Sequence, residues 1–282
     1  MTDQRVVAVL GRGVVQPDSL VLRADDLGVV RGDGIFETVH VRDGRPWLLD
    51  EHLARMVRSA SRLDIALPPR EALIDLAEQA LAGWPADVEA ALRLVCTRGP
   101  ESGGTPTVFA TVTPVAATTR RARRDGVRVI TATLGVAATA RPAAPWLLGG
   151  AKTLSYAVNM ASQRWATSQG ADDVLWLSAD GYALEAPTST LLWLVRDTLC
   201  TVPAEATGIL AGTTARHLLD HADSVGLGTD ERLVTVDDLV AADGVWLASS
   251  VRGLAEVRSL DGKALGPSPV TDRLADLVGH PR

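Results

Sequence analysis

Strand and helix patterns alternate along this 282-residue chain, and this alternation most constrains its fold. Ile35–Val41 is rich in β-branched residues, and Asp43-Gly44 after it is a hairpin turn signal. Glu51–Leu63 and Arg70–Leu81 then have helical spacing of their apolar residues. Similar alternation continues to the C-terminal part. The pattern predicts an α/β protein with mixed sheets of the α+β type.

An arginine-rich segment separates the predicted elements into two groups. It includes Arg120, Arg121, Arg123 and Arg124 and lies between two strand patterns, so we interpret it as solvated. We predict a smaller N-terminal α/β domain over residues 1–118 and an interdomain linker over 119–126. A larger C-terminal domain is predicted over 127–282. Each domain is long enough to enclose its own core.

Charge and hydropathy exclude several classes of protein. The formal net charge of −6 argues against a nucleic-acid partner. No stretch has the roughly 20 apolar residues of a membrane span, and Val6–Leu10 is too short for a signal-peptide core. Cys96 and Cys200 lie far apart in apolar strand patterns, which indicates buried free thiols. We therefore expect a cytoplasmic location.

Two motifs that could indicate a nucleotide or metal site are incomplete. The glycines at positions 11 and 13 begin a dinucleotide-binding fingerprint, but Gln16 stands where its third glycine belongs. His217 and His221 are four residues apart on a predicted helix, without a third ligand, and we interpret them as surface histidines. No metal site is predicted.

The chain has only two lysines, Lys152 and Lys263, although it has 28 basic residues. Lys263 follows a turn, where a solvated lysine is ordinary. Lys152 follows Gly149-Gly150-Ala151 and precedes a helix predicted from about Thr153 to Gly170. A helix N-terminus and desolvation both lower the pKa of an amine, as a Schiff-base lysine requires. From these residues alone, a surface lysine near a turn stays an open alternative.

Five segments, in one order along the chain, resemble the class IV PLP-dependent aminotransferases, the family of the D-amino-acid and branched-chain aminotransferases. They are GDGIFETVHVRDGRPWLLDEHLARMVRSA, AKTLSYAVNMAS, GYALEAPTSTLLWL, LAGTTARHLL and WLASSVRGLAEV. The KTLSY run and the TRG at residues 97–99 are most similar to the aminodeoxychorismate lyases of the family.

The resemblance implies the two-domain class IV fold, pyridoxal 5′-phosphate (PLP) as cofactor, a homodimer and a small amino-acid-like substrate. Its first functional implication is a lyase that converts 4-amino-4-deoxychorismate to 4-aminobenzoate and pyruvate in folate biosynthesis. One alternative is a transaminase for D-amino or branched-chain amino acids, which would use the same lysine and cofactor. A remote alternative is a non-catalytic, PLP-family binding protein.

The resemblance also implies roles for individual residues. Lys152 matches the catalytic Schiff-base lysine, which would move the proton at the substrate α-carbon. Glu185 matches the carboxylate that pairs with the pyridine nitrogen; otherwise it is an exposed glutamate at a strand end. Arg55 matches a phosphate-binding arginine; otherwise it pairs with Glu51 one helical turn earlier. Further cofactor contacts are predicted at Thr213, Thr214, Ser249, Ser250, Tyr156, Thr188 and Ser189.

The substrate contacts are less well defined by the sequence. Candidates are Arg98, Phe36 and Tyr156, and Arg98 is equally compatible with a structural ion pair. The loop after Arg98 lacks the second arginine that some of these lyases carry. Thr190 stands where many relatives have asparagine, so it is assigned no role.

The predicted helix Glu51–Leu63 has a clear apolar face. Leu53, Met56, Val57 and Ala60 recur at helical spacing and are expected to face the core. Arg55 lies off this stripe, near its edge.

Overall fold

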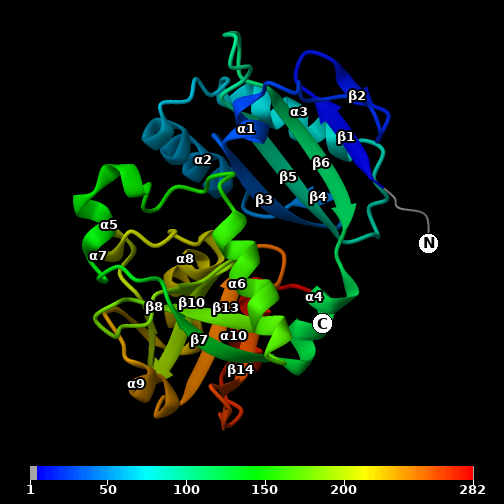
Figure 1. Cartoon of the computed structure of the whole chain (residues 1–282). Helices are drawn as coiled ribbons and strands as arrows, with labels where there is room; N and C mark the ends of the chain where they lie inside the picture. Colours follow the sequence, from blue (N-terminus) through cyan, green and yellow to red (C-terminus); the bar gives the residue numbers. More distant parts are fainter. Residues whose placement is uncertain (1–4, 282) are drawn as a thin grey trace. The chain divides into compact units, whose positions relative to one another are not determined.

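The computed structural model describes residues 5–281 (Figure 1). The chain forms two compact units, the first extending to Ala116 and including Ala151–Tyr156. The second unit comprises Ala117–Gly150 and the chain from Ala157 onward. Most of the segment predicted as a linker lies in helix α4 (Ala117–Asp125), which packs on strand β14 of the second unit. Its arginines therefore belong to a helix, and the predicted contiguous domains also miss the return of residues 151–156 to the first unit.

The first unit is built on a six-stranded antiparallel sheet of order β2-β1-β6-β5-β3-β4. Helix α2 packs on β3, and helix α3 packs on β1, β5 and β6. The strands are β1 (Val6–Val9), β2 (Gly13–Val15), β3 (Gly34–Arg42), β4 (Arg45–Pro46), β5 (Ala90–Thr97) and β6 (Val108–Pro114). The helices are α1 (Leu27–Val30), α2 (Leu49–Leu63) and α3 (Arg70–Leu81).

The second unit is built on a nine-stranded mixed sheet with the main path β12-β11-β10-β13-β14-β7-β8. The β7 strand is parallel to both of its neighbours, and β10 and β13 are antiparallel. The strands are β7 (Val127–Thr133), β8 (Asp173–Leu177), β9 (Glu185–Ala186), β10 (Ser189–Val195), β11 (Thr198–Thr201), β12 (Gly228–Glu231), β13 (Gly244–Ser249), β14 (Gly253–Leu260) and β15 (Lys263–Ala264). The helical segments after α4 are α5 (Ala140–Ala143), η1 (Pro145–Leu147), α6 (Ala157–Ser168), α7 (Ala204–Thr207), α8 (Thr213–Asp220), η2 (Ala222–Val225), α9 (Val236–Val240) and α10 (Thr271–Val278).

The central strands β10 and β13 are buried along almost their whole length. Trp193 and Trp246 are among the largest fully buried side chains of the described chain. Helix α8 packs on β13, and helices α4 and α10 pack on β14. A strand that is covered on both faces reads as a continuous apolar run, as Leu191–Val195 does.

The segment around Lys152 is extended, which contradicts the predicted helix start at Thr153. Thr153 bridges to Ile35 of β3, and the Leu154 N–H donates to the Gly34 carbonyl at 2.8 Å. Helix α6 begins only at Ala157. The backbone groups of residues 152–154 are therefore used by β3, so they cannot form the first helical turn.

Across residues 5–281, every helix is too short or too polar to cross a bilayer.

Candidate functional site

Lys152 is positioned in the first unit by backbone hydrogen bonds on both sides of its side chain. Its N–H donates to the buried Ser59 hydroxyl of α2 at 3.1 Å. Its carbonyl accepts the Phe36 N–H of β3 at 3.1 Å. The lysine is therefore fixed between a helix and a strand edge, and does not depend on a helix N-terminus for its environment.

The Lys152 amine lies against two aromatic rings. Its Nζ is 4.5 Å from the Phe36 ring centroid and 5.6 Å from the Tyr156 ring centroid. The two rings meet edge to face, with centroids 5.2 Å apart. The structure thus brings together three residues that were predicted from the sequence. An amine beside an aromatic wall is well placed to bond a planar aldehyde.

Arg93 approaches the same ring and was missed by the sequence analysis. Its guanidinium carbon is 5.5 Å from the Phe36 ring centroid, and its side chain is exposed. Strand register explains the approach, because Arg93 pairs with Thr38, which shares a sheet face with Phe36. A charged residue within the apolar run of β5 is the signal that could have identified it.

Arg55 lies in a buried ionic network beneath the first sheet. Its Nε and Nη2 each donate to Glu37 of β3 at 2.7 Å. The same carboxylate lies 2.7 Å from His52 Nδ1. Burial alone would raise the pKa of Glu37, but Arg55 and His52 lower it to about 2. Burial lowers the pKa of His52, with further contributions from Arg55 and Lys152.

The ionic partner of Arg55 is therefore Glu37, and not Glu51, which the helical spacing had offered as an alternative. A bidentate carboxylate fixes the plane of the Arg55 guanidinium. The contact of Arg55 with the cofactor phosphate stays a prediction.

Arg98 is occupied by structural contacts. It donates to Asp33 at 2.6 Å and to the carbonyls of Leu63 and Asp64 at the end of α2. These bonds satisfy helix carbonyls that would otherwise lack partners. The ion-pair alternative is thus present in the structure, and the substrate contact of Arg98 stays a prediction.

Glu185 lies in strand β9 of the second unit and is held by two donors. Arg141 Nη1 is 3.3 Å from its Oε1, and the Leu210 N–H donates to its Oε2 at 3.2 Å. Its side chain is only 13% exposed, so it is not the solvated strand-end glutamate that the sequence left open. The carboxylate orientation is therefore fixed. Arg141 of α5 was missed because nothing in the sequence links it to Glu185, 44 positions further on.

The second-unit residues predicted to contact the phosphate lie close together, at the ends of β10 and β13 and at the start of α8. Thr190 of β10 pairs with Glu185 on one side and with Ala248 of β13 on the other. Ser189 therefore begins β10 next to the end of β13, where Ser249 and Ser250 lie. The N-terminus of α8 approaches the same point, because a Cβ built on Gly212 would lie 2.2 Å from Thr190 Oγ1.

Two hydroxyl groups in this region indicate an anionic ligand. Ser189 Oγ and Thr214 Oγ1 are buried and make no hydrogen bond within the protein. A buried hydroxyl without a partner is costly, so a ligand with acceptor oxygens would satisfy both. Thr213, Thr214 and Gly212 also supply the first amides of α8, where an anion is favoured. These residues fit a phosphate group.

Thr188 has a protein partner. Gln163 of α6 donates to its hydroxyl at 3.4 Å, and Asn159 donates to the Pro187 carbonyl at 2.7 Å. Helix α6 therefore fixes the loop that precedes Ser189. The direct cofactor contact of Thr188 stays a prediction.

The two-unit fold, a lysine against two aromatic rings and strand ends that fit a phosphate group indicate a PLP-dependent enzyme. A profile of the family described as amino-transferase class IV matches residues 34–260, so the chain belongs to this family. Its cofactor is PLP. The fold class and cofactor predicted from the sequence are confirmed.

Individual relatives cover nearly the whole chain. It is 43% identical, over 97% of both chains, to the bifunctional aminodeoxychorismate lyase / D-amino acid transaminase of Mycobacterium tuberculosis. The PLP-bound structure of a hypothetical aminotransferase from Mycobacterium tuberculosis has a TM-score of 0.94 at 44% identity, covering 97% of each chain. A fold IV transaminase from Curtobacterium pusillum has a TM-score of 0.89 at 36% identity, covering 97% of each chain.

Proposed function

We propose that this chain is an aminodeoxychorismate lyase that forms 4-aminobenzoate and pyruvate. The arrangement of Lys152, Phe36 and Arg93 carries the proposal. An amine, an aromatic face and an exposed guanidinium on one side of a sheet suit a planar ring substrate that bears a carboxylate. The 43% identical relative named for this activity supports the assignment.

PLP, when bound, supplies an electron sink for the carbanion at the substrate carbon that carries the amine. The Lys152 amine would bind the cofactor and, after the substrate takes its place, remove the proton at that carbon. Loss of the enolpyruvyl group then completes the aromatic ring, and a protonated Lys152 can return a proton to the departing enolate to give pyruvate. Arg93 would orient the substrate by pairing with a carboxylate.

The other predicted residues would hold the cofactor. Glu185, fixed by Arg141, would pair with the pyridine nitrogen and keep the ring protonated, which improves the electron sink. The hydroxyls of Ser189 and Thr214, with the amides that begin α8, would bind the phosphate. Roles for Arg55, Ser249 and Ser250 in phosphate binding are proposed on the same basis.

A second candidate activity is D-amino acid transamination. The name of the 43% identical relative includes both activities, which favours this alternative over a branched-chain substrate. The cofactor machinery is common to both reactions, so substrate contacts such as those of Arg93 and Phe36 decide between them.

One assay separates the two. Purified enzyme is incubated with aminodeoxychorismate without a keto acid, and in parallel with D- and L-amino acids paired with keto acids. We expect 4-aminobenzoate to form without a keto acceptor, and this product to be absent with Lys152→Ala. Turnover that occurs only when a keto acid is added would overturn the lyase and leave the transaminase.

We also propose a homodimer in the cytoplasm. Val158 and Trp165 are exposed at 62% and 43% and lie seven residues apart on one face of α6, where a second copy would cover them. The buried, unpaired Cys96 and Cys200 suit a reducing compartment. Light scattering at several concentrations tests the dimer, and a monomer at all of them would disprove it.

A further inference from the structure

The turn that joins β13 and β14 is held by side chains from two other elements. Ser249 pairs with Gly253, so residues 250–252 form the connection. Three consecutive carbonyls, those of Ser250, Val251 and Arg252, accept hydrogen bonds from outside the turn. Such contacts fix the direction of successive peptide groups.

Arg123 of α4 makes two of these three contacts. Its Nε donates to the Arg252 carbonyl at 3.0 Å, and its Nη2 donates to the Val251 carbonyl at 2.5 Å. Its Nη1 donates to the Pro281 carbonyl at 2.9 Å, which links the turn to the C-terminal segment. One guanidinium therefore joins helix α4, the turn and the chain after α10.

His280 holds the remaining carbonyl. Helix α10 ends at Val278, and its C-cap Gly279 has a φ of 65°. The His280 Nε2 lies 2.7 Å from the Ser250 carbonyl oxygen. A carbonyl only accepts, so Nε2 carries the proton. A Cβ built on Gly253, whose φ is 72°, would lie 3.0 Å from the His280 ring, so any other residue would be strained there and would press on the histidine.

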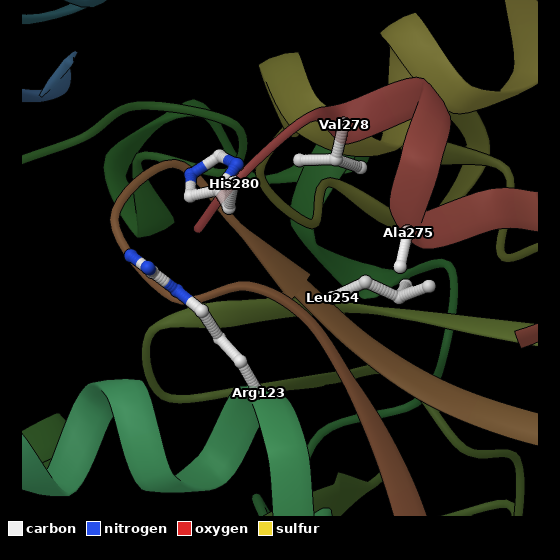
Figure 2. Close-up of a pocket in the computed structure, with 5 residues that line it drawn as sticks. All are labelled: Arg123, Leu254, Ala275, Val278 and His280. Atoms are coloured by element: carbon white, nitrogen blue, oxygen red, sulfur yellow. The ribbon is translucent and has the colours of Figure 1, made fainter. Parts of the chain in front are cut away.

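Figure 2 shows Arg123 and His280 reaching the same small cavity from α4 and from the segment after α10. Leu254, Ala275 and Val278 complete its lining. The cavity volume is about 10 Å³, room for about one water molecule, so it is no cofactor pocket. The two side chains act on the turn rather than on a ligand of their own.

The direction of the carbonyls determines the direction of the amides. In a trans peptide the N–H points opposite to the preceding C=O, and the described chain has no cis peptide. The N–H groups of Val251 and Arg252 therefore point away from His280 and Arg123. Successive amides on one side of a turn form an anion-binding concavity. The Arg252 side chain is tied elsewhere, to the buried Asp173 at 2.7 Å.

We propose that Arg123 and His280 are positioning residues that hold the 250–252 turn in an anion-binding conformation. The anion is an oxygen group of the bound reactants, either the cofactor phosphate or a substrate carboxylate. The proposal rests on the proposed function, since that function places Ser249 and Ser250 against the cofactor. Both side chains act through the turn and touch neither reactant.

The test compares variants of the full chain. Arg123→Met and His280→Leu remove the donors, and His280→Gln keeps a donor for the Ser250 carbonyl. Arg124→Met is the control, because Arg124 is an exposed neighbour on α4. Apo-protein is titrated with PLP and with pyridoxal, which lacks the phosphate. KM and kcat for the amino substrate and the melting temperature are measured alongside.

If the turn binds phosphate, Arg123→Met and His280→Leu raise the Kd for PLP about tenfold and that for pyridoxal less than about twofold. If it binds the substrate carboxylate, both Kd values are kept and KM rises about tenfold with little change in kcat. Either result supports the proposal when His280→Gln and Arg124→Met resemble the wild type.

Two results would overturn it. One is a set of Kd and KM values within about twofold of the wild type in both donor-removing variants. The other is an equal loss of PLP and pyridoxal binding with a lower melting temperature, which indicates only a stability role. Wild-type protein that binds no PLP would instead refute the proposed function, so the two failures are distinguishable.

Discussion

The two lysines of the chain have contrasting surroundings. Lys152 is partly buried, with its amine over the rings of Phe36 and Tyr156. Lys263 is exposed in β15, with Asp237 at 3.9 Å as its ionic neighbour. A reactive amine benefits from apolar walls that exclude water, whereas an exposed ammonium is stabilised by solvent. Only Lys152 has the environment of a nucleophile.

Replacing Lys152 by alanine tests this difference. We expect Lys152→Ala to lose turnover by at least about a thousandfold, because a general base alone contributes roughly 10²–10⁴. Covalent cofactor should also disappear, as measured by borohydride reduction followed by peptide mapping. Lys263→Ala is the matched control and should retain both. Full turnover by Lys152→Ala would refute the assignment.

Glu37 is a buried charged residue whose loss should strongly affect folding. It is fully buried, and three hydrogen bonds or ionic contacts from Arg55 and His52 satisfy its carboxylate. Its pKa falls from 4.5 to about 2 on folding. A group with a lowered folded-state pKa stabilises the protein above its unfolded pKa and loses that contribution as the pH falls.

Stability should therefore decline as the pH drops from 4.5 towards 2. The lowered pKa of His52 adds a decline that begins at higher pH, as the pH falls below 6.5 and the unfolded histidine takes up a proton. Glu37→Gln leaves Arg55 buried without its anion and should cost about 3 kcal/mol of unfolding free energy near neutral pH. It should also flatten the acid dependence. Urea unfolding at several pH values measures both effects, with the exposed Glu51→Gln as control. Equal stability of Glu37→Gln and wild type would contradict this account.

At the scale of elements, the start of α8 depends on close packing against β10. Gly212 precedes the helix with an extended backbone, and a side chain there would collide with Thr190 Oγ1. The amides and hydroxyls of Thr213 and Thr214 follow directly. A shift of this helix end would move the groups that we assign to the phosphate.

Gly212→Ala should therefore weaken PLP binding. Overpacking costs about 1–3 kcal/mol, and we expect the Kd for PLP to rise about tenfold or more. Titration of apo-protein measures the change. Gly266→Ala in the same unit is the control, since a Cβ there meets nothing within 4 Å. An unchanged Kd in Gly212→Ala would show that α8 does not bind the phosphate.

Elements also show where the sequence prediction was accurate and where it was not. The helix expected over Glu51–Leu63 is present as α2, and Leu53, Met56 and Ala60 are buried as predicted. Val57, however, is 53% exposed, and Arg55 is buried. The spacing of apolar residues identifies only the apolar face of a helix. It could not predict that Arg55 would be buried, because this burial depends on the ion pair with Glu37 of β3.

At the scale of the whole molecule, the cofactor should contribute to stability. A ligand that binds only the folded chain stabilises it by about 2.7 kcal/mol at a hundredfold excess over its Kd. For a chain of this length that corresponds to a melting temperature higher by about 5 °C or more.

Calorimetry of apo and PLP-loaded protein measures this difference. Lys152→Ala should show a smaller shift, because non-covalent contacts alone remain. Identical melting temperatures for the apo and loaded wild type, at a PLP concentration that saturates activity, would contradict the prediction.

The α/β class and the family could be predicted from the sequence alone, which also singled out Lys152 as the candidate reactive lysine. These predictions follow from local periodicity, turn residues and five ordered motifs, which all depend on residues close together in the sequence. The extended segment at Lys152 could not be predicted from the sequence, because it arises when Ile35 and Gly34 of β3 bind the backbone of the two residues that follow the lysine. Contacts between residues distant in sequence could not be predicted either. Those of Arg93 with Phe36 and of Arg141 with Glu185 depend on how strands pair and how the chain folds back on itself.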